Sequence, residues 1–257
     1  MKEETTYIDV GNNKILNLDV DEFNSFIAFT DDDEVISDNI KLKINEKFQY
    51  LLIRKLNNER FLIADSRSLN DFNGYIYNFN GQLISTFLAG DGIEDIVIQR
   101  NKIVVTYFDE GVLGKNGPNN NGVAVFNFQG QVEFGFNESI GSAEIIDCYC
   151  ICKHGENRVL FYAYTEFKVY ELNLDNYQWE AFETPDTFLG ASAMTSKENN
   201  IIFHSSYDNK TCFFSWNRNT NEVTILGNYS SELTGLKNGK FLAFDDKGFT
   251  IVEPMEQ

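Results

Sequence analysis

Acidic side chains gather where short apolar runs begin and end in the middle of this sequence. They are Asp91, Glu94, Asp95, Asp109, Glu110 and Asp147. Carboxylates that converge can bind Ca²⁺ through their oxygens, and the candidate ligands are Asp95, Asp109 and Asp147. They could also hold one carboxyl protonated as a general acid. The simpler interpretation is that an Asp at the start of a strand caps backbone N–H groups of a neighbouring strand.

Other catalytic signatures are missing from the chain. The sequence has no GxSxG, HExxH or Walker motif. It has only two histidines, His154 in an expected turn and His204 in an expected strand. A Ser-His-Asp triad would have to use one of these two. We therefore expect no catalytic residue, and no cofactor unless the carboxylates bind calcium.

The elements that must position the carboxylates are short β-strands. Residues 90–136 contain four runs of β-branched and aromatic residues bounded by Gly, Asn or Asp, which is typical of an antiparallel four-stranded blade. The apolar run of the second strand recurs about every 40 residues along the chain, which is the period of WD40-like propeller blades. Its first residues are Phe26, Phe61, Ile103, Val159, Ile201 and Phe241.

The repeat predicts an all-β chain that forms a six-bladed β-propeller in a single domain, 1–257. The blades fall roughly at 14–45, 46–89, 91–136, 144–184, 188–227 and 232–254. The last blade lacks a fourth strand, and we expect Thr5–Val10 to supply it, which would close the ring. The alternative is five blades plus an N-terminal flap. The segment 114–122, rich in Gly and Asn, is expected to be a mobile surface loop.

In an antiparallel blade, the connections after the second and fourth strands emerge on the same side. The connections expected after the second strands carry acid at Asp31, Asp32, Asp33, Asp65, Asp109, Glu110, Glu166, Asp208, Asp245 and Asp246. The topology therefore predicts one acidic face. The alternative is that Asp is common in turns wherever they lie.

The formal net charge of −18 narrows the possible partners. An acidic surface repels phosphate backbones and anionic lipids, so we expect neither nucleic acid nor membrane as a partner. It would attract a basic protein or a small cationic ligand, although the charge could serve solubility alone. The N-terminal residues show no apolar signal segment, which favours a cytoplasmic location. We also expect a monomer.

Four short motifs resemble those of a family of uncharacterised bacterial proteins. They are GDGIED (90–95), YFDEGV (107–112), DCY (147–149) and YAYTEF (162–167). The chain departs from the family pattern at DCYCIC, and at Glu166, where the family has aspartate. The resemblance implies a propeller-like bacterial protein and no particular chemistry. It draws attention, for folding or for binding, to Asp95, Asp109, Glu110, Asp147, Tyr164 and Thr165.

Three functional hypotheses follow. The first is a non-catalytic binding module that presents its acidic loops to a basic protein or a cationic ligand, for example an immunity-type inhibitor of a toxic nuclease. Its binding residues would be Asp91, Glu94, Asp95, Asp109, Glu110, Asp147, Tyr164, Thr165 and Glu166. The second is a metal-dependent hydrolase of the six-bladed lactonase type, with carboxylates in the central channel. The third is a carbohydrate-binding or cell-surface role.

Overall fold

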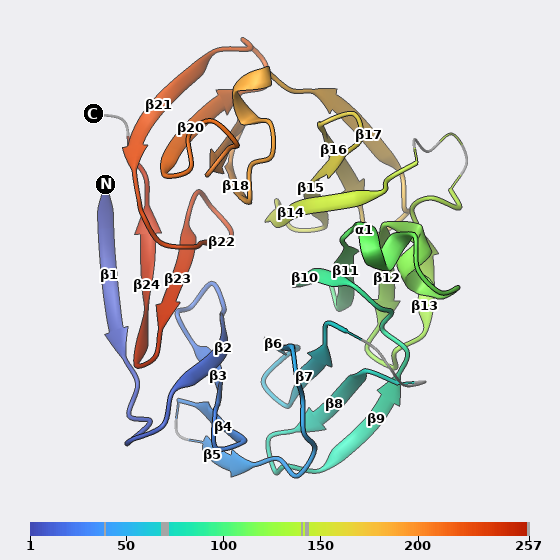
Figure 1. Cartoon of the computed structure of the whole chain (residues 1–257), viewed down its shortest axis with the longest axis vertical. Helices are drawn as coiled ribbons and strands as arrows, with labels where there is room; N and C mark the ends of the chain where they lie inside the picture. Colours follow the sequence, from blue (N-terminus) through green and yellow to red (C-terminus); the bar gives the residue numbers. More distant parts are fainter. Residues whose placement is uncertain (39, 68–71, 140, 142–143, 256–257) are drawn as a thin grey trace. The chain divides into compact units, whose positions relative to one another are not determined.

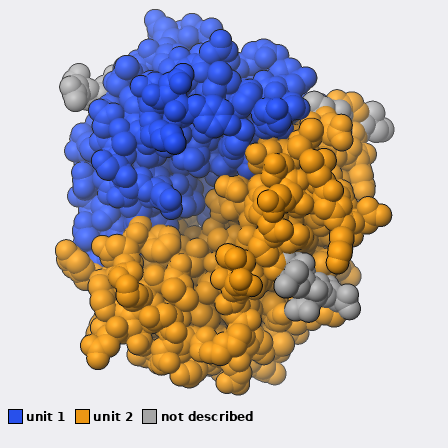
Figure 2. All heavy atoms as spheres, in the orientation of Figure 1, with its two compact units in different colours: residues 1–6, 148–243, 249–257 blue, residues 7–147, 244–248 orange. Residues whose placement is uncertain are grey.

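The computed structural model describes residues 1–38, 40–67, 72–139, 141 and 144–255. The chain divides into two compact units, shown in different colours in Figure 2. Unit 1 comprises 1–6, 148–243 and 249–257, and unit 2 comprises 7–147 and 244–248. The described residues form six four-stranded sheets, three of them mainly in each unit. The paired strands for which a register is known run antiparallel within these sheets.

Unit 2 contains the three sheets formed by β2 to β13 (Figure 1). The first sheet consists of β2 (Ile15–Val20), β3 (Phe26–Thr30), β4 (Glu34–Ser37) and β5 (Ile40–Lys43). The second consists of β6 (Leu51–Lys55), β7 (Arg60–Asp65), β8 (Gly74–Asn78) and β9 (Leu83–Phe87). The third consists of β10 (Ile93–Gln99), β11 (Lys102–Tyr107), β12 (Val123–Asn127) and β13 (Val132–Gly135).

Unit 1 contains the other three sheets. One consists of β14 (Asp147–His154), β15 (Arg158–Tyr164), β16 (Lys168–Asn173) and β17 (Trp179–Glu183). The next consists of β18 (Ala193–Lys197), β19 (Asn200–His204), β20 (Cys212–Asn217) and β21 (Val223–Asn228). The last has the order β1-β24-β23-β22, from β1 (Lys2–Tyr7), β24 (Gly248–Glu253), β23 (Phe241–Asp245) and β22 (Thr234–Gly235).

The six sheets confirm the six predicted repeats, and the five-blade alternative is wrong. An N-terminal strand does complete the last sheet, but it lies at Lys2–Tyr7 and not at Thr5–Val10. It is the outer strand, and its polar, mostly exposed side chains suit an edge. In the part of the chain that the structure describes, no helix has the length and apolar character needed to cross a bilayer.

The core of each unit lies on the inner strands of its sheets. The second strands β7, β11 and β15 are buried along almost their whole length. In unit 2, the first and third sheets cover the two faces of β7. The faces pack through clusters such as the one that joins Leu62 and Ile76 of the second sheet to Ile103 and Phe126 of the third. This packing explains why the second strands are continuous apolar runs in the sequence.

The segment 111–122, which includes the predicted mobile loop 114–122, has local helical structure, and the mobility of the loop stays a prediction. It contains the end of a short helix, α1 (Asp109–Val112), and a 3₁₀ turn, η1 (Pro118–Asn121). The side-chain amide of the buried Asn119 donates to the backbone oxygens of Gly111 (2.7 Å) and Lys115 (2.9 Å). Asn120 likewise donates to the Val112 oxygen (2.7 Å). These side-chain amides donate to backbone oxygens of the same segment, and the bonds join parts of the segment to one another.

Candidate functional site

An irregularity in β10 positions the two central acidic residues of unit 2. Ile93 pairs with Tyr107 and Asp95 pairs with Thr106, so that Glu94 is an extra residue without a partner in the ladder. A β-bulge of this kind bends the strand and redirects side chains, and bulges are common beside functional sites. Glu94 is exposed at the bulge, while Asp95 is partly buried. These two adjacent carboxylates therefore have different surroundings.

Asp95 is part of a buried ion pair. Its Oδ1 accepts from Nη2 of Arg54 at 2.5 Å and from the backbone N–H of Ile96 at 2.6 Å. The Arg54 side chain is only 9% exposed, and its Nε donates to the Ile96 backbone oxygen at 2.7 Å. Arg54 also reaches the first sheet, where Nη1 donates to Asn17 at 3.2 Å. Asp95 thus helps to fasten three neighbouring sheets of unit 2 together.

Glu94, Asp109 and Asp147 form what we call the carboxylate cluster. Part of the Glu94 side chain is exposed, yet the protein atoms around it desolvate the carboxylate. This desolvation, together with the charges of Asp95 and Asp147, raises the pKa of Glu94 to about 7. Desolvation and the charge of Asp109 raise the pKa of Asp147 to about 6. The structure therefore brings these predicted residues within electrostatic reach of one another.

The loops that carry the cluster are fixed by a close approach of two glycines. A Cβ on Gly111 would lie 2.2 Å from the Asp91 backbone oxygen and 2.8 Å from the Cα of Gly92. The N–H of Phe108 donates to the Gly92 oxygen at 2.9 Å, and the N–H of Asp91 donates to Asn119. The segments GDGIED (90–95) and YFDEGV (107–112) therefore have a folding role, because Gly92 and Gly111 allow their backbones to touch.

Asp91 and Glu110 do not join the cluster but hold Arg67, which follows β7. Nε of Arg67 donates to Asp91 at 3.2 Å, and Nη1 donates to Glu110. The guanidinium carbon lies 5.4 Å from the centroid of the Phe108 ring, within range of a cation–π contact. Sequence analysis did not single out Arg67 or Phe108, because nothing local in the sequence links Arg67 to residues 24 and 43 positions away.

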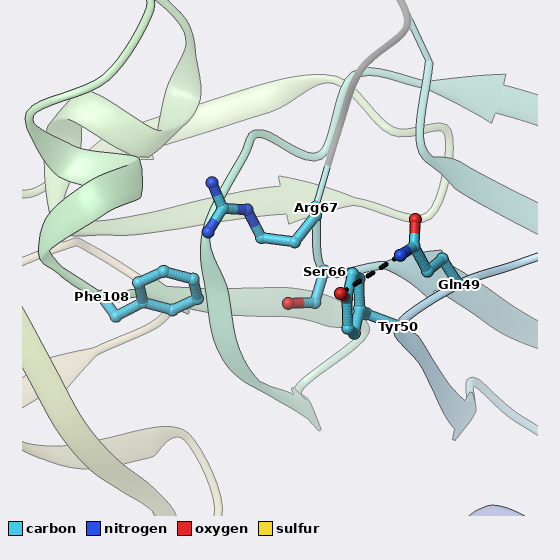
Figure 3. Close-up of a pocket in the computed structure, with 5 residues that line it drawn as sticks. All are labelled: Gln49, Tyr50, Ser66, Arg67 and Phe108. Carbon is cyan, nitrogen blue, oxygen red and sulfur yellow. Dashed lines mark hydrogen bonds between the residues drawn. The ribbon is translucent and has the colours of Figure 1, made fainter.

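Beside Arg67 is a cavity of about 530 Å³, which we call the aromatic pocket. It is lined by Gln49, Tyr50, Ser66, Arg67 and Phe108 (Figure 3). Ser66 lies between Phe108 and Tyr50, and its hydroxyl points toward the Phe108 side. The side-chain amide of Gln49 donates to the Tyr50 hydroxyl at 3.2 Å. A cavity of this size with aromatic walls and a few polar groups has the composition of a ligand site.

The other predicted binding residues belong to unit 1 and form a separate group on the β15–β16 connection. Tyr164 makes an edge-to-face contact with Phe167, with ring centroids 5.4 Å apart. Glu166 pairs with Lys168 at 2.7 Å. Thr165 is exposed between them.

Several acidic residues in the connections after the second strands have a local structural role. Asp31 accepts from the Lys14 backbone N–H at 2.9 Å, and Asp245 accepts from the N–H groups of Lys247 and Gly248. Asp32 and Asp33 pair with lysines. Bonds of this kind agree with the alternative that Asp is common in turns, and they account for part of the acidic loop composition.

No group of three His, Cys, Asp or Glu side chains within the described ranges is placed to share a metal ion. The four cysteines are buried and free. Of the three proposed calcium ligands, Asp95 already binds Arg54. The calcium alternative, and the hydrolase that depends on it, stay predictions.

Known structures resemble the whole chain. A virginiamycin B lyase from Staphylococcus aureus, crystallised as an inactive H270A variant with quinupristin, has a TM-score of 0.55 at 11% identity, covering 98% of this chain and 99% of that one. Hsv2 from Kluyveromyces lactis has a TM-score of 0.61 at 10% identity, covering 96% and 75%. The Cps50 (Swd1) β-propeller domain from Myceliophteria thermophila has a TM-score of 0.58 at 10% identity, covering 94% and 84%.

The chain is a six-bladed β-propeller. The likenesses, at identities this low, establish the fold of this propeller and not its activity. No family profile matches the sequence, and no curated protein matches it significantly. What the propeller does must therefore be argued from its own residues.

Proposed function

We propose that this propeller is a binding module whose carboxylate cluster receives cationic groups of a basic protein. The observation that carries the proposal is the raised pKa of both Glu94, to about 7, and Asp147, to about 6. A raised pKa means that ionising these carboxyls is unfavourable in the folded protein, because desolvation and like charges oppose it. A bound ammonium or guanidinium group would relieve that repulsion.

The charge of the whole chain supports the same kind of partner. With 39 acidic and 21 basic residues, the protein attracts cations over long range and speeds their encounter. Rigid propellers commonly present loops to partners, since the sheets hold the loops in fixed positions. The specific version, an immunity-type inhibitor that covers the basic active site of a toxic nuclease, stays a prediction. A basic protein is the class of partner that the cluster favours.

The test is binding of a fluorescent lysine-rich peptide, followed by fluorescence anisotropy. We expect affinity to fall about tenfold or more as ionic strength rises from about 50 to about 300 mM, because the contacts are between charges. The variant Glu94→Gln/Asp147→Asn should weaken binding at low salt. Its control, Glu156→Gln/Glu180→Gln, removes the same number of charges from exposed positions in unit 1.

The two double variants separate a site from a general charge effect. If both lose the same affinity, the peptide responds to net charge alone and the cluster is not a site. Binding that does not respond to salt would also contradict the proposal. The variants should keep the unfolding temperature of the parent or exceed it, so a loss of binding cannot be assigned to misfolding.

A further inference from the structure

The aromatic pocket is built on a backbone that is already fixed. The Asp65 carboxylate accepts from the backbone N–H of Gln49 at 2.9 Å and from that of Tyr50 at 3.1 Å. The Ser66 N–H donates to the Tyr50 backbone oxygen at 2.8 Å. These bonds join the segment before β6 to the end of β7 and set the distance between Tyr50 and Ser66. A ligand would find this wall of the pocket preformed, which lowers the entropic cost of binding.

The opposite wall is held as firmly. Phe108 is fixed through its backbone bond to Gly92, and Arg67 lies over its ring. The charge of Arg67 is matched by Asp91 and Glu110. An anionic ligand would have to compete with both carboxylates and with the overall negative charge of the chain. The pocket therefore does not suit an anion.

The groups that remain available are aromatic faces and neutral polar atoms. Tyr50 is 53% exposed, so its ring is open to a partner. Within the described part of the chain, no hydrogen bond involves the Ser66 hydroxyl, which can donate or accept. Aromatic walls prefer a further aromatic ring in a stacked or edge-to-face arrangement. A hydroxyl and an amide at the wall can bond a phenol or an indole N–H.

The pocket and the carboxylate cluster flank the same short helix. Asp109, the first residue of α1, interacts electrostatically with Asp147 in the cluster. Glu110, the second residue, forms an ion pair with Arg67 at the pocket. A single peptide segment that contacts the cluster would therefore pass close to the pocket. Anchor residues at protein interfaces are often Trp or Tyr placed in a preformed pocket and surrounded by weaker charged contacts.

We propose that the aromatic pocket receives an uncharged aromatic side chain, Tyr or Trp, of a basic partner segment whose cationic residues meet the carboxylate cluster. This inference rests on the proposed function for the cationic half of the contact. The aromatic half is independent of charge and is tested separately.

The first experiment uses small neutral probes and ¹⁵N chemical shifts of the intact protein. N-acetyl-tryptophanamide should shift the amide signals of Tyr50, Ser66 and Phe108 in a saturable way. N-acetyl-leucinamide should bind several-fold more weakly, and N-acetyl-lysinamide and N-acetylglucosamine should not saturate these signals. Stronger shifts with the lysine or the sugar probe, or none with the tryptophan probe, would overturn the aromatic assignment.

Two variants make the result specific. Tyr50→Ala removes an exposed ring but leaves the backbone bonds to Asp65 and Ser66, so it should abolish saturation by the tryptophan probe. The control Phe23→Ala removes another exposed ring, 83% exposed, from the same unit and should leave it unchanged. If saturation persists in Tyr50→Ala, the probe binds elsewhere and the inference is wrong.

A peptide series distinguishes this inference from the proposed function. A lysine-rich peptide is compared with copies in which one Trp is moved through every position. At least one position should improve affinity for the parent protein about tenfold, and Tyr50→Ala should cancel that gain alone. If no Trp position improves affinity but binding still weakens with salt, the pocket is rejected and the proposed function is not. If a Trp position improves affinity but binding does not depend on salt, the role of the carboxylate cluster is rejected and the pocket is not.

Discussion

The guanidinium of Arg54 bonds to the carboxylate of Asp95 across two neighbouring sheets, with 2.5 Å between Nη2 and Oδ1. Both side chains are largely buried, at 9% and 18% exposed. The pair gives Asp95 a structural role, and its role as a ligand or partner-binding residue stays a prediction. Glu94, one residue earlier at the bulge, does not pair with Arg54.

Removing one member of this pair should destabilise unit 2 strongly. Arg54→Met leaves the Asp95 carboxylate buried without its partner, and we expect the free energy of unfolding to fall by about 3–5 kcal/mol. Urea unfolding followed by fluorescence measures the change. The double variant Arg54→Met/Asp95→Leu removes both charges and should recover much of the loss. A double variant no more stable than the single one would show that the hydrogen bonds of Arg54 to Ile96 and Asn17, and not the charge pair, carry the stability.

The stability of the protein should depend on pH through Glu94. Its pKa is raised to about 7 from the ordinary 4.5, so between these values the folded state binds more protons than the unfolded state. The free energy of unfolding should therefore fall as pH rises through this window. Glu94→Gln cannot ionise, so it should match the parent near pH 5 and unfold at a higher temperature near pH 8. Thermal unfolding across this range, with Glu156→Gln as the equal-charge control, measures the difference. Equal gains in both variants would mean that net charge, and not the cluster, is responsible.

Binding of a cationic peptide should depend on pH in the opposite sense. As pH rises from about 5 to about 8, Glu94 and Asp147 lose their protons and become able to attract cations. We expect the affinity of the lysine-rich peptide to increase over this interval and the increase to disappear in Glu94→Gln/Asp147→Asn. Calorimetry in buffers of different ionisation enthalpy should detect proton release on binding near pH 6.5. Affinity that is constant with pH would contradict the assignment of these two carboxyls.

The contact between the two glycine segments can be tested by adding one methyl group. Gly111→Ala would place Cβ 2.2 Å from the Asp91 oxygen, so the two backbones must separate. We expect a loss of about 2–3 kcal/mol in the free energy of unfolding. The control Gly11→Ala has open space around its Cβ but a φ of +60°, and should cost about 1 kcal/mol. If the two variants lose the same stability, the close approach is not an important restraint.

The hairpin asparagines offer a further test. The Asn127 side-chain oxygen accepts from the backbone N–H groups of Gln129 (2.9 Å) and Gln131 (3.1 Å), and Asn78 does the same in its own hairpin. Asn127→Ala should lower the free energy of unfolding by about 1 kcal/mol, because it removes these bonds. Asn127→Asp keeps an acceptor and should lose less. Equal losses in both variants would contradict this role of the side chain.

The spacing of the apolar runs shows how far the sequence could go. The six repeats were predictable because a strand covered on both faces must be apolar along its length. Such a run is visible in the sequence without knowledge of the neighbouring sheets.

The parts of the site that were not predicted depend on residues far apart in sequence. Arg54 lies within an apolar run and finds Asp95 on another sheet, 41 residues away. The aromatic pocket combines the segment before β6 with the ends of β7 and β11. The Gly and Asn content of 114–122 predicts a mobile loop, but it does not indicate the bonds that Asn119 and Asn120 donate to the backbone of Gly111 and Val112. Composition indicates how freely a segment can move when alone, and it does not show which neighbours restrain it.

The placement of β1 has a consequence for synthesis of the chain. Lys2–Tyr7 is synthesised long before its partner β24, which spans Gly248–Glu253. Until β24 has emerged, β1 has no strand to pair with, and the last sheet cannot form completely. Nascent chains stalled before residue 248 should therefore expose the N-terminal segment to protease, and should become resistant there once the missing strand is supplied.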